Sequence, residues 1–118
     1  MENRRQKGSL YEQKVAQYLT DHGFHILEMN YRCRIGEIDI IAREAEYLVF
    51  IEVKYRKDTA KGLPQEAVNL RKQRVISKVA DYYCMTKGIY GTCACRFDVA
   101  AVLGEEIKLI RNAFYYAG

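Results

Sequence analysis

The spacing of apolar residues along the chain predicts a helix, three strands, a second helix and two further strands. In residues 8–22 the apolar side chains recur at helical spacing, and Gly23 is typical of a helix end. Residues 43–46 suit the connection of a hairpin. The three segments whose β-branched and aromatic residues predict strands are 24–31, 37–42 and 47–54.

The second half of the chain again combines a helix with strands. Pro64 suits the first turn of a helix that continues to about Thr86. Residues 93–103 and 107–110 predict two strands with a turn at Gly104. We therefore expect one α/β domain over residues 1–118, with a central mixed sheet flanked by helices. The apolar stripe of the second helix consists of Val68, Ile76, Val79, Ala80 and Tyr83.

Charged residues stand inside the two strands that the hairpin would join, at Asp39, Glu52 and Lys54. Because side chains alternate along a strand, Glu52 and Lys54 share one face. In an antiparallel pair Asp39 can project on the same side, where facing Cβ atoms lie about 5 Å apart. Two carboxylates at that range repel each other, and their burial is unfavourable unless a cation neutralises them.

A magnesium ion satisfies this requirement, because it binds carboxylate oxygens, keeps several waters and often completes its shell with a substrate phosphate. A lysine beside the ion could hold or deprotonate a water, or stabilise the charge that develops on the phosphate. The same residues also suit a surface hairpin on which Glu52 and Lys54 form a solvated pair. The pattern alone leaves both interpretations open.

The order of Asp39 and Glu52-Val53-Lys54 resembles the signature of the PD-(D/E)xK nuclease superfamily. That superfamily includes restriction endonucleases, Holliday-junction resolvases and RecB-type nuclease domains. Ile38 stands where the superfamily's name has proline. Over nearly its whole length the chain is similar to the YraN-like family of small bacterial proteins. The positions that carry this second resemblance are Gly8, Glu12, Ala16, Asn30 and the segments 36–39, 50–56 and 96–99.

The resemblance implies a restriction endonuclease-like core and a Mg²⁺-dependent nuclease, with Mn²⁺ as a substitute ion. The implied substrate is DNA, in particular branched or repair intermediates, whose phosphodiester bonds are hydrolysed. Asp39 and Glu52 would bind the ion, with the Val53 carbonyl as a further ligand. Lys54 would orient or activate the attacking water, and Glu12 would assist in the metal shell.

Glu12 has a second interpretation that the sequence leaves open. It precedes Val15, Ala16 and Leu19 by three, four and seven residues, so it can face the sheet. Alternatively, Ser9-Leu10-Tyr11-Glu12 spells a capping box, in which the glutamate would bond only a backbone amide at the helix start.

Composition adds a small basic excess. The 118-residue chain has 49% hydrophobic residues, enough for the core of one domain, with a net charge of +4 and a pI near 8.9. This charge is compatible with a nucleic-acid partner. There is no run of about 18 apolar residues and no apolar secretory segment, so we expect a cytoplasmic protein without a membrane partner. A homodimer is as compatible with the sequence as a monomer.

Basic residues gather around the start of the second helix. Because phosphate contacts come mainly from Lys and Arg, they predict a DNA-binding surface. A solvated helix face would carry the same charges. The residues predicted to contact DNA are Arg56, Lys57, Arg71, Lys72 and Arg74, with Lys61 and Lys78 beside them.

The cysteines lack the paired spacings of zinc sites, and we interpret them as reduced thiols in or near the core. Their number also matches the iron–sulfur cluster of some RecB-like nucleases, which needs four converging ligands. The four are Cys33, Cys84, Cys93 and Cys95.

Arg96 and Asp98 lie on one face of the predicted strand 93–103, where they either brace the sheet as a buried pair or take part in chemistry. Three function classes remain at this point: a metal-dependent nuclease, a nucleic-acid-binding module that keeps the fold without turnover, and a metal-independent interaction protein.

Overall fold

The structure, a computed structural model, describes residues 4–56 and 68–117, with side chains from residue 10 onward. The order of helices and strands predicted from the sequence is confirmed. The elements are α1 (Arg4–Asp21), β1 (His25–Arg32), β2 (Glu37–Glu44), β3 (Tyr47–Arg56), α2 (Leu70–Thr86), β4 (Ala94–Leu103) and β5 (Glu106–Phe114).

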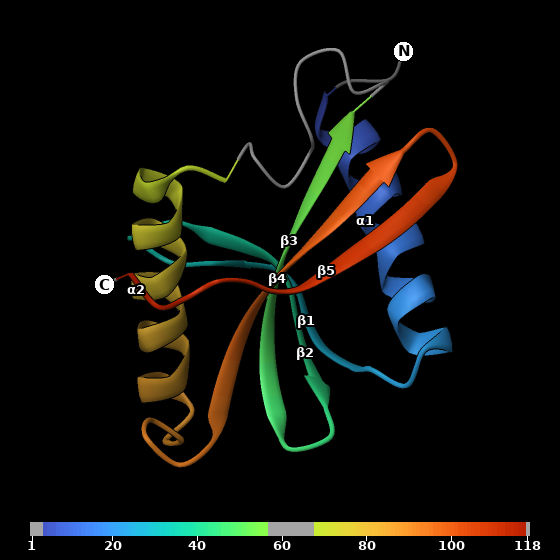
Figure 1. Ribbon diagram of the computed structural model, residues 1–118. Helices are drawn as coiled ribbons and strands as arrows, with labels where there is room; N and C mark the ends of the chain where they lie inside the picture. The colour runs from blue at the N-terminus through green and yellow to red at the C-terminus, as the bar shows by residue number, and fades with distance from the viewer. Residues whose placement is uncertain (1–3, 57–67, 118) are drawn as a thin grey trace.

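The described strands form one mixed sheet in the order β1-β2-β3-β4-β5. Every neighbouring pair is antiparallel except β3 and β4, which are parallel and are connected through α2. Figure 1 shows α1 and α2 on opposite sides of this twisted sheet, with the beginnings of both helices toward the same end of the molecule as the end of β3. The expected α/β fold with a central mixed sheet is thus confirmed, and it is compatible with a restriction endonuclease-like core.

Each face of the sheet packs a separate apolar core. On the α1 side, Val15 and Leu19 pack against Ile40 and Ile51, all fully buried. Burial of an aliphatic side chain of this size stabilises the fold by about 1.5–3 kcal/mol. On the α2 side a row of stacked aromatic rings crosses the sheet, at centroid distances of 5.6 Å and 5.1 Å, from Phe50 to Phe97 and from Phe97 to Phe114.

The start of α1 differs from the prediction, and the difference decides the position of Glu12. The helix begins at Arg4 rather than Gly8, because Arg, Gln and Lys before the glycine are good helix formers. Glu12 therefore lies in the helix interior, and the interpretation of residues 9–12 as an N-terminal capping box is wrong.

The start of α2 also differs. The predicted start at Pro64 lies outside the described residues, but Val68 and Asn69 are not helical, so a continuous helix from residue 64 is wrong. The helix begins at Leu70, because Asn69 is in the extended conformation and its side chain accepts a hydrogen bond from the Lys72 nitrogen at 2.9 Å. Asparagine is a strong N-cap, and this local bond sets the first turn.

The strands β2, β3 and β5 are longer than predicted. The β2–β3 connection is a turn of two residues, Ala45 and Glu46, in place of four, and Ala45 has a positive φ of 51°. β5 extends to Phe114, beyond the predicted end at residue 110. None of the described helices is long and apolar enough to span a membrane.

A close approach holds the start of β2 against α2. A Cβ atom on Gly36 would lie 2.7 Å from Val75 Cγ1, which is too short for a van der Waals contact. Only glycine leaves room here, so the loop before β2 can pack directly on the helix.

Candidate functional site

A pocket of about 270 Å³ opens where parts of α1, β2, β3 and α2 meet. The residues to which the resemblance assigned catalysis or Mg²⁺ binding all line this pocket, namely Glu12, Asp39, Glu52, Val53 and Lys54. The lining residues are Tyr11, Glu12, Glu37, Asp39, Glu52, Val53, Lys54, Tyr55 and Lys72.

Asp39 lies where the pairing of β2 and β3 ends. The antiparallel register stops at Ile40↔Ile51, and beyond it Asp39 Oδ2 accepts a hydrogen bond from the Val53 nitrogen at 2.8 Å. A side chain of β2 thus binds a backbone donor of β3 that the ladder no longer pairs. This arrangement fixes the carboxyl group between the two strands.

Glu52 is the most deeply buried acid of the pocket, with 6% of its surface exposed. Within the described part of the chain, its Oε2 atom has no hydrogen-bond partner, and the nearest cation is Lys72 Nζ at 3.7 Å. Burial, followed by the neighbouring Asp39 carboxyl, raises the pKa of Glu52 to about 9, while Lys72 and Lys54 oppose this rise. The acid is strongly destabilised in its charged form.

Glu12 reaches the same pocket from the α1 side of the sheet. Its burial, together with the charges of Asp39 and Glu37, raises the pKa of Glu12 to about 7. The Asn30 side chain opposes that rise. When the amide nitrogen of Asn30 faces Glu12, it donates to both carboxylate oxygens, at 2.9 Å and 3.1 Å.

Asn30 is a site residue to which the sequence analysis gave no role. It stands inside β1 with a positive φ of 54°, a conformation that asparagine tolerates better than most residues. An asparagine within an otherwise apolar and charged strand is the signal that could have indicated it. Its backbone conformation and its bonds to Glu12 place it beside the acids.

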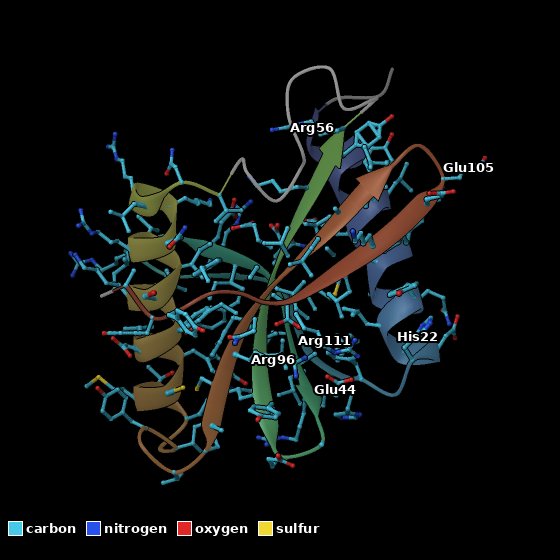
Figure 2. All side chains as sticks on the ribbon, in the orientation of Figure 1. His22, Glu44, Arg56, Arg96, Glu105 and Arg111 are labelled. Atoms are coloured by element: carbon cyan, nitrogen blue, oxygen red, sulfur yellow. The ribbon has the colours of Figure 1, made fainter. Side chains whose placement is uncertain are left out.

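The basic residues predicted to contact DNA lie in different surroundings. Arg56 lies at the end of β3, far from Arg96 (Figure 2). Arg71 and Arg74 are exposed on the first turns of α2. Lys57 and Lys61 lie outside the described residues. Lys72 differs from its neighbours because it lines the pocket beside Glu52, which the sequence did not indicate.

A second charged cluster is separate from the pocket. Arg96 makes two hydrogen bonds to Asp98, both at 2.9 Å, and one to Glu44 at 2.7 Å, and Arg111 also pairs with Glu44 at 2.7 Å. Figure 2 shows Arg96, Arg111 and Glu44 close together. The hydrogen bond from Arg111 lowers the pKa of Glu44. Asp98 is fully buried and accepts two hydrogen bonds from Arg96 and one from the Asn112 nitrogen. The pair therefore braces the sheet, as one of the two interpretations predicted.

The four cysteines are free thiols. Cys84, Cys93 and Cys95 line a second, largely apolar pocket of about 170 Å³, and Cys33 is not among its lining residues. In residues 4–56 and 68–117, no group of three or more His, Cys, Asp or Glu side chains is arranged to hold a metal ion as it stands. The proposal of a four-cysteine cluster therefore has no support from this geometry.

Sequence comparison places the chain among known relatives. Residues 11–102 match the model of "Uncharacterised protein family UPF0102". A UPF0102 protein of Lachnoclostridium phytofermentans is 51% identical over 112 residues, which cover 95% of each chain. A UPF0102 protein of Syntrophus aciditrophicus is 51% identical over 93% of this chain and 89% of its own. A UPF0102 protein of Caldicellulosiruptor saccharolyticus is 40% identical over 95% of this chain and 99% of its own.

Proposed function

The chain belongs to the UPF0102 family, and we propose that it is a Mg²⁺-dependent nuclease of the PD-(D/E)xK type that hydrolyses phosphodiester bonds in DNA. Branched or repair intermediates are the proposed substrates, and Mn²⁺ is the proposed substitute ion. The observation that carries the proposal is the Glu52 carboxyl, buried beside Asp39 with one oxygen that has no hydrogen-bond partner in the described part of the chain.

The acids of the pocket repel one another, and a divalent cation bound between them would remove that repulsion. Asp39 and Glu52 crowd each other in a buried place, and a cation between them would offset both the repulsion and the loss of hydration. Mg²⁺ needs only one or two protein carboxylates, because it keeps several waters. Asp39 and Glu52 would hold it, with the Val53 carbonyl as a third ligand. A bound Mg²⁺ supplies Lewis-acid stabilisation of the phosphate and a more acidic water.

The lysine and the helix acid complete the proposed site. Lys54 follows Glu52 by two residues on β3 and lines the same pocket, so its ammonium can orient a water and stabilise charge on the phosphate. Glu12, held by Asn30, would accept hydrogen bonds from waters around the ion. Its raised pKa near 7 also suits it to exchange a proton near neutral pH.

The DNA backbone would approach from the start of α2. Arg56, Arg71 and Arg74, together with Lys57, are the proposed phosphate contacts around the pocket. The exposed side chains of Arg71 and Arg74 suit a sequence-independent contact, as a structure-selective nuclease requires. The four free thiols are compatible with the reducing cytoplasm, where DNA is accessible.

The decisive experiment offers junctions, flaps, single strands and duplexes to the wild-type protein with Mg²⁺, Mn²⁺ or EDTA at matched salt. We expect cleavage of at least one branched DNA that depends on the cation. Lys54→Ala should lose cleavage while it keeps the stabilisation by the cation, because the lysine acts on the water and the phosphate. Asp39→Asn should lose both.

Two outcomes would redirect the proposal. If the wild-type protein binds these DNAs but cuts none of them with any cation, the function is that of a nucleic-acid-binding module that retains the fold. If Lys54→Ala cuts as fast as the wild type, the pocket is not the centre of the reaction.

A further inference from the structure

Lys72 differs from the other basic residues of α2 because its side chain reaches the acids. Its Nζ atom lies 3.7 Å from Glu52 Oε2, and it lines the pocket. In the described part of the chain, the lining of the pocket does not include the exposed residues Arg71, Arg74 and Lys78. One charge of this helix therefore belongs to the site, whereas its neighbours belong to the surface.

The N-cap of α2 sets the position of the Lys72 backbone. Asn69 Oδ1 accepts the hydrogen bond of the Lys72 nitrogen at 2.9 Å, and Val68 before the cap is buried in the α2-side core. The ammonium stands on a four-carbon side chain that is 36% exposed, so it can change direction while its Cα stays in place. Because the backbone of Lys72 is fixed and its side chain can reorient, the ammonium group can exchange one binding partner for another.

The contact with Glu52 is an ion pair without a hydrogen bond. A separation of 3.7 Å exceeds the range of a good N–H···O bond, about 2.7–3.2 Å, and Glu52 Oε2 has no hydrogen-bond partner in the described residues. Glu52 is buried, with 6% of its surface exposed, and it lines the pocket together with Lys72 of the first turn of α2. Lys72 thus lies within ion-pair range of Glu52 without a hydrogen bond to it.

On the premise that the pocket is a cation-dependent nuclease site, we propose that Lys72 exchanges Glu52 for the DNA phosphate. Its ammonium stays beside Glu52 until a divalent cation binds that side chain as its carboxylate, and it then binds a non-bridging phosphate oxygen of the substrate. The reason is electrostatic, because the cation and the ammonium repel each other and cannot share one buried carboxylate. Lys72 is then a positioning residue that couples cation binding to phosphate binding.

The exchange is tested by DNA affinity, which requires no turnover. Fluorescence anisotropy with a labelled branched DNA compares EDTA with Ca²⁺, a hard cation with the same preference for oxygen, at matched ionic strength. We expect the cation to raise the wild-type affinity about tenfold, within the usual range of coupling between two sites. Lys72→Met should lose this rise and keep its affinity in EDTA within about twofold, because its proposed phosphate contact forms only after the cation binds.

Lys78→Met is the matched control, because it removes the same charge from the exposed face of the same helix. Any loss of affinity in this variant should be equal with and without the cation. In a thermal-shift titration without DNA, Lys72→Met should respond to lower cation concentrations than the wild type, because the competing ammonium is gone. These two measurements separate the exchange from a general loss of positive charge.

The proposal is overturned if Lys72→Met keeps the cation-dependent rise, or if it loses as much affinity in EDTA as with the cation. A wild-type affinity that does not respond to the cation overturns it as well. Failure of the nuclease function is distinguishable, because it shows as absent cleavage in the wild type. The coupling of cation and DNA, and its loss in Lys72→Met, can hold in a protein that cuts nothing.

Discussion

Asp39 binds β3 through its side chain, because its Oδ2 atom accepts the Val53 N–H at 2.8 Å just beyond the last paired residues of β2 and β3. One oxygen of a proposed metal ligand is therefore fixed by the backbone of the strand that carries the other ligand, Glu52. The separation of the two acids is set by strand geometry rather than by flexible side chains. A site held in this way needs little rearrangement when it binds an ion.

Asp39→Asn should separate the two tasks of this side chain. The amide oxygen can still accept the Val53 bond, so the fold should persist, but the negative charge that holds the cation is lost. A cation present at 100 times its dissociation constant stabilises the wild type by about 2.7 kcal/mol, and the variant should lose most of this gain. Thermal denaturation with and without Mn²⁺ measures the difference. An equal Mn²⁺ effect in both proteins would exclude Asp39 as a ligand.

The stability of the protein should fall as the pH rises. Glu52 has a pKa of about 9 in the folded state and about 4.5 in the unfolded chain, so between these values only the folded state holds the proton. The contribution is fully present below about pH 4.5 and is lost by about pH 9, at no more than about 1.4 kcal/mol per pH unit. Urea denaturation across this range measures the slope.

Glu52→Gln is the matched variant for this slope, because glutamine keeps the size of the acid and cannot ionise. Its stability should decrease less between pH 5 and pH 9 than that of the wild type, by the linkage of proton binding to unfolding. A slope as steep as that of the wild type would assign the pH dependence to other groups, of which Glu12, with a pKa of about 7, is the first candidate.

Arg96→Met should strongly destabilise the fold, although it lies outside the pocket. The change leaves the fully buried Asp98 without its two hydrogen bonds from the guanidinium, a loss that costs about 3–5 kcal/mol in buried pairs. Arg111→Met is the control, because the Arg111 side chain is 52% exposed and an exposed ion pair contributes only about 0–1 kcal/mol. Chemical denaturation compares them, and equal costs would contradict the role of Arg96 as a brace.

Arg71→Ala combined with Arg74→Ala should weaken DNA binding in a salt-dependent way. Each phosphate contact contributes about 0.9 to the slope of log affinity against log salt, so the slope should shrink by about 1.8. Lys87→Ala with Lys108→Ala removes two charges from other exposed positions and should leave the slope unchanged. A slope that does not change in the Arg71 and Arg74 variant would place the DNA on another surface.

The strands and their acids were predictable because the signals are local. β-branched and aromatic residues around Asp39 and Glu52 predicted the two strands, and alternation along β3 correctly placed Glu52 and Lys54 on one face. An acid in such a strand is rare enough to indicate a site. Ile76, Val79, Ala80 and Tyr83 of the predicted stripe are buried on α2, as helical spacing indicated, whereas Val68 is buried before the helix begins.

The helix starts were not predictable, because competing local signals were of similar strength. Ser9 and Glu12 read as a capping box, yet α1 continues through that position from Arg4. Pro64 and Asn69 both suit a helix start, and the structure begins α2 after Asn69. The helix formers before Gly8 decide the first choice and the N-cap bond of Asn69 decides the second, and neither signal outweighs its competitor in the sequence alone.

Contacts between distant segments were beyond the sequence altogether. The pairing of Glu44 with Arg96 joins residues 52 positions apart, and that of Glu44 with Arg111 joins residues 67 apart. Lys72 and Glu52 meet only because α2 crosses the sheet between β3 and β4. Such pairs follow from the topology of the sheet rather than from a pattern along the chain.

The parallel pairing of β3 with β4 has a consequence for how the protein is made. Asp39, Glu52 and Lys54 are all synthesised before β4, whose residues pair with β3 from Tyr47↔Ala94 to Arg56↔Leu103. A nascent or truncated chain that ends before β4 would expose the apolar, unpaired edge of β3, which is a template for intermolecular strand pairing. The half of the chain that carries the acids therefore depends on a late, long-range contact to stay soluble.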